Sequence, residues 1–304
     1  MMILKLVIAS YLLAISDCNS ESTKVLKEPL QPLQAVEKKP RTLEPIADLP
    51  GVLKECSGMV ELGHQNVVAL NDSGASAKLY VFNPEHPEDV KTVVVLGVKN
   101  HDWEELATDE NHVYIGDTGN NGGKRQNLMI YKVRKTDLET KDSITAEIIK
   151  FSYQAQTKFT DSNRHNWDCE AFVCVGDSLF LFTKNRGDLK TGVCGFPKVP
   201  GTYVATIYDT YDSHGLVTGA DYRKTGSGDE LVLVGYDVTG NGYHPFVIHF
   251  TDFKGNQFFQ GKSDRWEYDK VLQTETILFH NNNEVWISNE EEHGDEGKIY
   301  SLQL

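Results

Sequence analysis

One acidic motif occurs twice in the sequence, as Asn-x-Asp-x-Glu at positions 100–104 and 166–170. Its carboxylates are Asp102 and Glu104 in the first copy, and Asp168 and Glu170 in the second. Side chains of an extended strand alternate between two faces, so the three polar residues of each copy point the same way. Carboxylates that face one another must take up protons, accept hydrogen bonds or hold a cation. The motif therefore indicates cation binding or acid–base chemistry.

A cation held by these residues would be bound through oxygen atoms. The sequence has no His- or Cys-rich metal spacing, and Glu275 stands at a position equivalent to Glu104 and Glu170 in a further repeat. Oxygen-only ligands suit Ca²⁺, which takes about six to eight of them. The predicted calcium ligands are Glu104, Glu170, Glu275, Asp102 and Asp168. The alternative is a structural network in which the acids only accept hydrogen bonds from neighbouring strands.

A second polar set follows the strongly apolar segments, and we assign it to a ligand-binding face. Its members are Asp72, Asp117, Asn120, Asn121, Asn185, Asp237, Asn289 and Glu290. Lys184 and Arg186 fall in the same set, and with Lys124 and Arg125 they would hold an anion such as phosphate. Ordinary surface charge is the alternative for these basic residues. His101 and His165 flank the acidic motifs and are further acid–base candidates.

These sets define a candidate catalytic group. A bound Ca²⁺ would polarise a phosphoryl oxygen, and Lys184 or Arg186 would stabilise the charge that develops there. Asp102, Asp168 or Glu104 would activate the attacking water. Glu170 completes the candidate group.

A repeated pair of strands positions both polar sets. A short strand that starts with acidic or small residues leads through a turn to an apolar strand that ends in Asp, Asn or Glu. The repeats begin at residues 57, 104, 170, 220 and 275, so the period is about 47 to 66 residues. Each repeat has a third strand, and four have a fourth, predicted at 91–96, 145–152, 203–211 and 257–268. No long helical periodicity occurs.

Such a recurrence predicts an all-β fold, a β-propeller with five four-stranded blades, although six blades are possible. A strand near residues 42–46 would complete the last blade and close the ring. In a blade, the start of the first strand and the end of the second lie at the same end of the central tunnel. Both polar sets are therefore expected at one mouth of the tunnel. Trp103 and Trp167, within the acidic motifs, are expected to wedge between blades.

Two resemblances follow from these segments. Residues 102–121, 168–185, 218–222 and 273–290 resemble secreted bacterial propeller proteins of uncharacterised or phytase-esterase-like type, which implies the fold and export but no settled activity. The five units with inner-strand Glu residues are also similar to the calcium-activated apyrases, five-bladed propellers with Ca²⁺ in the tunnel. That resemblance implies that Glu104, Glu170 and Glu275 stand near the metal. The intervening loops depart from the apyrase pattern, so nucleotidase activity is implied by architecture alone.

The N-terminal segment has the features of an export signal. Residues 1–19 carry Lys5 and then an apolar run at 6–15, which is too short to span a bilayer. Cleavage after 14–16, lipidation at Cys18 and retention of the segment as an anchor are the alternatives. Residues 20–42 are a polar linker, and residues 43–304 are the single propeller domain. We expect a secreted, periplasmic or outer-surface protein, attached to a membrane only through a lipid at Cys18.

The charge balance restricts the partners. A formal net charge of −14 disfavours nucleic acids and anionic membranes and favours cations. The expected partner is a small molecule or protein at the tunnel face, and the expected state is a monomer. Three functions stay open: a ligand-binding propeller with a cation, a metal-assisted hydrolase of phosphate esters or anhydrides, and a lactonase or esterase. Apart from Cys18 there are four cysteines, too few for a disulfide scaffold.

Overall fold

The computed structural model describes residues 40–239, 242–291, 294 and 296–304. The predicted signal segment 1–19, including Cys18, and residues 20–39 of the predicted linker lie outside the described residues. Within the described part of the chain, neither helix is long or apolar enough to cross a membrane. Near the start of the described residues, the guanidinium of Arg41 lies 4.2 Å from the centroid of the Trp266 ring.

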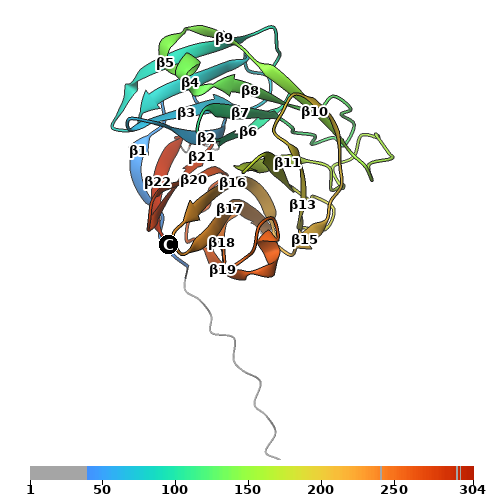
Figure 1. Ribbon diagram of the computed structural model, residues 1–304. Helices are drawn as coiled ribbons and strands as arrows, with labels where there is room; N and C mark the ends of the chain where they lie inside the picture. Colours follow the sequence, from blue (N-terminus) through green and yellow to red (C-terminus); the bar gives the residue numbers. More distant parts are fainter. Residues whose placement is uncertain (1–39, 240–241, 292–293, 295) are drawn as a thin grey trace, which may run out of the picture. The chain divides into compact units, whose positions relative to one another are not determined.

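Five sheets form the fold, and each follows the predicted order of antiparallel strands (Figure 1). The first blade consists of β2 (Cys56–Gly63), β3 (Asn66–Asn71), β4 (Lys78–Asn83) and β5 (His86–Leu96). The second consists of β6 (Trp103–Thr108), β7 (His112–Asp117), β8 (Met129–Arg134) and β10 (Glu147–Tyr153). The third consists of β11 (Cys169–Val175), β12 (Ser178–Thr183), β13 (Thr191–Pro197) and β15 (Asp209–Tyr211).

The last two blades complete the ring. The fourth consists of β16 (Leu216–Thr225), β17 (Gly228–Thr239), β18 (Gly242–Thr251) and β19 (Lys262–Glu267). The fifth consists of β20 (Thr274–Asn281), β21 (Glu284–Asn289), β22 (Lys298–Gln303) and the N-terminal strand β1 (Glu44–Asp48). The first strands contact one another in the order β2, β6, β11, β16, β20 and back to β2. They therefore line a central tunnel, and the predicted five-bladed propeller, closed by an N-terminal strand, is confirmed.

Two short strands cross from one blade to the next. β9 (Ser143–Thr145) pairs in parallel with β5, and β14 (Gly201–Ala205) pairs in parallel with β10. The prediction of one fourth strand over 203–211 was therefore wrong, because its first half joins the second blade and only β15 stays in the third. Helix α1 (Lys135–Thr140) precedes β9, and a 3₁₀ turn, η1 (Phe258–Gln260), precedes β19.

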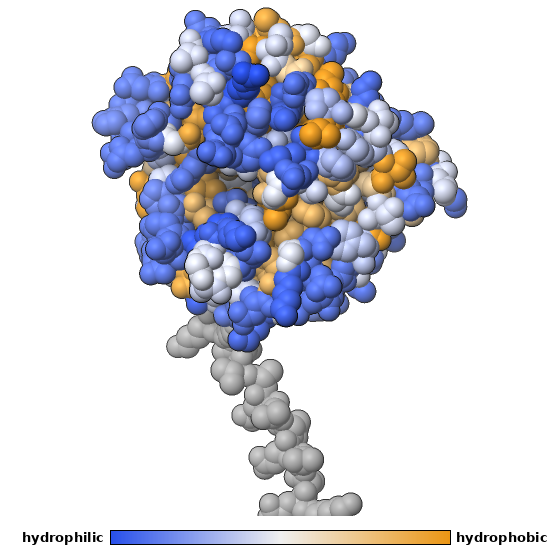
Figure 2. Space-filling view, viewed as in Figure 1, coloured by the Kyte–Doolittle hydropathy of each residue, from blue (hydrophilic) through white to orange (hydrophobic). Residues whose placement is uncertain are grey.

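The apolar core is divided among the five blade interfaces. One cluster fills the space between the first and second blades and includes Trp103, which is fully buried. Trp167 packs against the cluster between the second and third blades, so both tryptophans lie between blades as expected. The four described cysteines are free thiols. Figure 2 shows hydrophilic side chains over most of the face it draws, with apolar side chains visible between them.

Candidate functional site

The five inner strands share one backbone irregularity near the tunnel mouth. Each carries one more residue than the second strand with which it pairs, and the register shifts at that point. The residues at these bulges are Ser57, Glu104 with Glu105, Glu170, Thr218 and Glu275, and all are buried. A bulge bends its strand and re-aims a side chain. The predicted common level of three glutamates thus coincides with a ring of bulges.

A group of three carboxylates lies at the junction of the first and second blades. One carboxylate oxygen each from Asp72, Asp102 and Glu104 lies within 4.8 Å of the other two. Glu104 is 3% exposed, and its Oε1 atom is buried without a hydrogen-bond partner. Gly119 provides the room, because a Cβ there would lie 2.0 Å from Glu104 Oε1 and 2.6 Å from Asp102 Cγ.

Electrostatics oppose ionisation of this group in the absence of a cation. Burial, followed by the charges of Asp72 and Asp168, raises the pKa of Asp102 to about 7. Burial also raises the pKa of Asp72, and it raises that of Glu104 well above the usual range, with Glu170 adding to the effect. Arg125 gives only partial relief, since its Nη1 atom is 4.0 Å from Asp102 Oδ2. The group therefore has to bind protons or a cation.

On the other side of the mouth, Lys184 already supplies a positive charge. Its ammonium forms a buried ion pair with Glu170 and lies 5.0 Å from the centroid of the Tyr236 ring. Arg186 joins them through Nη2, 3.5 Å from Glu170 Oε1. Glu170 and the neighbouring charges raise the pKa of Lys184 well above its usual range, although burial opposes this. Lys184 thus occupies the place that a cation would otherwise take beside Glu170.

Glu275 and Glu290 form a third part of the rim. Gln273 Nε2 donates to Glu275 Oε1 at 2.8 Å and to Glu290 Oε2 at 2.7 Å. Burial raises the pKa of each of these two carboxyls to about 8. The amide of Gln273 links them without adding charge, so this pair is not neutralised as Glu170 is.

These three parts surround one cavity of about 190 Å³. The predicted residues that line it are Asp72, Glu104, Asn121, Glu170, Lys184, Arg186, Glu275 and Glu290. Its other lining residues, Tyr236, Tyr243 and Gln273, were not predicted. The first two belong to the fourth blade, whose second strand continues past Asp237 to residue 239. The unusual length of this strand was the signal in the sequence from which these two lining residues could have been predicted.

Two of the predicted aspartates, Asp168 and Asp117, do not line the cavity but bind residues of the loops beside it. Asp168 is fully buried, accepts from the backbone N–H of Asn120 at 2.7 Å and contacts Arg186 Nε at 3.1 Å. Asp117 is also fully buried and accepts from Arg125 Nη2 at 2.6 Å. His101 Nδ1 lies 2.9 Å from the other oxygen of Asp117. The Asn120 side chain is also hydrogen-bonded within the protein, since its Nδ2 donates to the Trp167 carbonyl at 2.9 Å.

Three other predicted residues do not line the cavity. Asn185 accepts from Thr183 Oγ1 at 2.6 Å, and Asn289 accepts from the Lys298 backbone N–H at 2.9 Å. Both side chains thus stabilise the turns after their strands. Asp237 is part of β17 and is not among the described lining residues. His165 Nε2 lies 3.1 Å from the Asn121 carbonyl oxygen, at the loop beside the cavity.

Glu105 is a buried residue of the tunnel that sequence reasoning missed. Its carboxylate accepts from the backbone N–H of Leu106 at 2.8 Å and from that of Ala220 at 3.2 Å. Ala220 belongs to the fourth blade, so this side chain crosses the tunnel from the second blade. Burial raises the pKa of Glu105 well above its usual range. Its adjacency to Glu104 was the only signal in the sequence.

No protein-family model and no curated protein matches the chain. Among solved structures, it is similar to the catalytic domain of Coprinopsis cinerea GH62 alpha-L-arabinofuranosidase, with 12% identity, a TM-score of 0.47 and coverage of 87% of this chain and 97% of that chain. The WD40 beta propeller domain of Doa1 gives 9% identity, a TM-score of 0.38 and coverage of 86% and 97%. These values carry no argument about activity. The blade topology itself defines the class, a five-bladed β-propeller. No family model and no curated protein supports the phytase-esterase-like or apyrase-like resemblance.

Proposed function

We propose that this propeller binds a divalent cation, Ca²⁺, through Asp72, Asp102 and Glu104, and that the cation and the cavity beside it form a ligand-binding face. The observation that carries the proposal is Glu104 Oε1, a buried carboxylate oxygen without a hydrogen-bond partner, in a group of three carboxylates. Such an oxygen is costly to bury unless something compensates it. A cation would compensate it.

The spacing of the three oxygens suits Ca²⁺. Twice the calcium–oxygen distance is about 4.6 to 5.2 Å, and the three oxygens all lie within 4.8 Å of one another. One Ca²⁺ could therefore contact all three with little movement of the side chains. Since Ca²⁺ takes about six to eight oxygens, positions would remain for water or for a ligand in the cavity. This set differs from the one proposed from the sequence, because Lys184 neutralises Glu170 and Gln273 bridges Glu275 to Glu290.

The experiment is thermal unfolding of the purified full-length protein in EDTA and then with added CaCl₂ or MgCl₂. A ligand at about 100 times its Kd stabilises the folded state by about 2.7 kcal/mol. For a domain of this size, that amounts to roughly 5 to 10 °C in Tm. Glu104→Gln should remove the calcium-dependent rise while the protein stays folded in EDTA, because the unpartnered oxygen tolerates the loss of its charge.

Glu290→Gln is the matched control, since Glu290 lines the same cavity but lies outside the group of three carboxylates. It should keep most of the rise. The proposal fails if neither cation changes the Tm of the parent protein. It also fails if Glu104→Gln responds to calcium as the parent does.

Hydrolysis of phosphate esters or anhydrides is the second candidate. Arg186 favours it, because its side chain is 25% exposed and lines the cavity shared with Glu104. Arg186 and Lys184 are, however, engaged by Asp168 and Glu170, so a phosphate would have to compete with those carboxylates. We therefore rank binding above hydrolysis. Turnover of p-nitrophenyl phosphate or ATP that depends on calcium and is lost in Glu104→Gln would reverse this order.

A further inference from the structure

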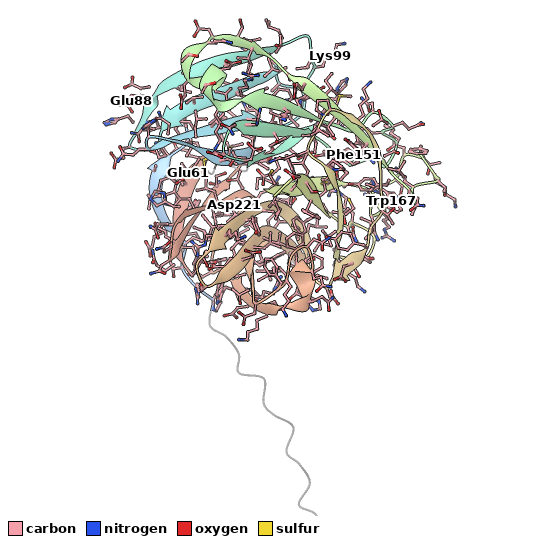
Figure 3. All side chains as sticks on the ribbon, in the orientation of Figure 1. Glu61, Glu88, Lys99, Phe151, Trp167 and Asp221 are labelled. Atoms are coloured by element: carbon pink, nitrogen blue, oxygen red, sulfur yellow. The ribbon has the colours of Figure 1, made fainter. Side chains whose placement is uncertain are left out.

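A second cavity lies at the opposite end of the propeller from the acidic mouth. It measures about 420 Å³ and lies at the seam between the first and last blades. It is lined by the β2–β3, β4–β5 and β20–β21 hairpins and by β1. Since inner strands start at the acidic mouth, the hairpins that follow them lie at the far end. Glu61, which lines this groove, lies close to β1 in Figure 3.

Backbone irregularities converge on this groove. The β1–β22 register shifts at Ile46, and the β20–β21 register shifts at His280. His64 and Gln65 both have positive φ, 53° and 65°, although neither is glycine. All four residues line the groove. The two positive φ angles belong to the two-residue turn of the β2–β3 hairpin, whereas the bulges at Ile46 and His280 bend their strands and re-aim side chains that line the groove.

A flat ring pair forms one wall. The imidazole of His280 stacks on the indole of Trp286, with centroids 3.7 Å apart and 14° between planes. His280 Nδ1 lies 3.2 Å from Glu61 Oε1, which fixes the rotation of the ring. The His280 side chain is 35% exposed, and Ile46, 46% exposed, adds apolar surface nearby. The wall is therefore rigid and flat, with a carboxylate at its edge.

The other polar side chains in the lining are amides, a carboxylate and the imidazole of His64. Asn66, Asn83 and Gln65 supply amide donors and acceptors, and Glu85 supplies a carboxylate. Among the described lining residues there is no lysine or arginine, so a phosphate or another anion finds no permanent positive charge there. A ligand for this groove needs an apolar face for the ring wall and hydroxyl groups at its edge for the carboxylates and amides. A pyranose ring has both.

We propose that the groove at the β1 seam binds neutral carbohydrate, with one sugar ring stacked on His280 and its hydroxyl groups donating to Glu61. The cavity is of the size that small-molecule sites typically have, about 300 to 1,000 Å³. It can therefore hold more than one sugar ring. This site is separate from the cation site and does not depend on it.

The test is saturation-transfer NMR and calorimetry on the full-length protein, with cellobiose, maltose, xylobiose and chitobiose as probes and digalacturonate as an acidic comparison. At least one neutral disaccharide should bind with a Kd of about 10 mM or lower, and digalacturonate should bind more weakly. His280→Ala and Glu61→Gln should each weaken that binding about tenfold. His214→Ala, at an exposed histidine elsewhere, should not.

Binding should also persist in EDTA and in Glu104→Gln, which separates this site from the cation site. The proposal is overturned if none of the four neutral disaccharides binds. It is equally overturned if binding is unchanged in both groove variants.

Discussion

Glu170 and Glu104 are both carboxylates buried at the tunnel mouth, but their surroundings differ. Beside Glu170 the chain supplies its own cation, Lys184, whose ammonium makes a buried ion pair. Glu104, which lines the same cavity, has one carboxylate oxygen that is buried without a hydrogen-bond partner. The charge of Glu170 is neutralised by the chain itself, whereas that of Glu104 has to be removed by a proton or balanced by a cation. This electrostatic difference across a single cavity is the reason that we place the proposed cation on the Glu104 side.

Removing the buried positive charge of Lys184 should destabilise the fold. Lys184→Met leaves Glu170 buried with only Arg186 nearby, so we expect the free energy of unfolding to fall by about 3 kcal/mol, near the lower end for a broken buried pair. Glu170→Gln leaves Lys184 unpaired and should cost a similar amount. In the double variant both charges are absent, so its loss should be clearly smaller than the sum of the two single losses.

Urea unfolding in EDTA measures these differences. The control is Lys262→Met, which breaks an exposed pair in which Lys262 Nζ lies 2.7 Å from Asp252 Oδ2. That change should stay within about 0.5 kcal/mol of the parent. Strictly additive losses for Lys184 and Glu170 would show that the two side chains do not act as a pair.

The position of the acidic residues along the tunnel could be predicted from the sequence, but the residues that they contact could not. Side-chain alternation and the repeat placed Glu104, Glu170 and Glu275 on inner strands, where the structure has them. The neutralisation of Glu170 depends on how Lys184 folds back from the end of the adjacent strand. The grouping of Asp72 with Glu104 depends on the approach of two blades. Neither contact has a signature in the local pattern, because both arise from tertiary packing.

At the scale of the strands, side chains near the tunnel join blades as well as fill it. Asp221 on β16 accepts hydrogen bonds at 2.8 Å from the backbone N–H of Tyr222 and from that of Phe279 on β20. It therefore links the fourth blade to the fifth, and Figure 3 labels its position among the strands. Burial raises the pKa of Asp221 to about 7.

This carboxyl should make stability depend on pH. An Asp in the unfolded chain has a pKa of about 3.9, so folding takes up a proton at Asp221 between about pH 4 and 7. Its contribution to stability is complete below about pH 4 and is lost as the pH rises through 7. Asp221→Asn should therefore lose less unfolding free energy than the parent between pH 5 and pH 8, as measured by urea unfolding at each pH.

Glu88→Gln, at an exposed carboxylate, should follow the parent curve and serves as the control. An Asp221→Asn curve parallel to that of the parent would mean that Asp221 keeps the same protonation state in the folded and unfolded chains over this range.

The number and order of strands were largely predictable, and the exchanges between blades were not. Alternating apolar segments mark each strand, so the blade starts and the closing N-terminal strand were found. The segment 203–211 has one continuous β pattern in the sequence, yet Gly201–Ala205 pairs with the second blade and Asp209–Tyr211 with the third. A pattern of side chains shows that a strand forms, but the choice of neighbour depends on which sheet edge is free.

For the whole molecule, stability depends on keeping five separate cores closed in a ring. Each core lies between two blades, so opening one interface exposes the apolar faces of two sheets. The segment around β1 reaches two of these cores. Leu43 is buried in the core between the fourth and fifth blades, and Leu49 in the core between the fifth and first. Closure of the ring therefore rests on a short strand of five residues, Glu44–Asp48.

A disulfide between β1 and β22 tests this account. Glu44 and Ser301 are direct partners in the antiparallel pair, and Cα atoms in such pairs lie about 4.5 to 5.5 Å apart, which a disulfide can span. Glu44→Cys with Ser301→Cys, in a Cys174→Ser background that removes the partly exposed thiol, would tie the ring closed. Because the bridge encloses nearly the whole propeller, chain entropy predicts a gain of up to about 5 kcal/mol.

The comparison is urea unfolding of this variant oxidised and then reduced with dithiothreitol, so that the sequence is the same in both arms. If separation of β1 from β22 is the step that opens the ring, the oxidised form should unfold at a clearly higher urea concentration. It should also unfold more slowly, because the bridge blocks that opening. If the two forms unfold alike although the bridge is present, another blade interface opens first, and β1 is not the weak point of the propeller.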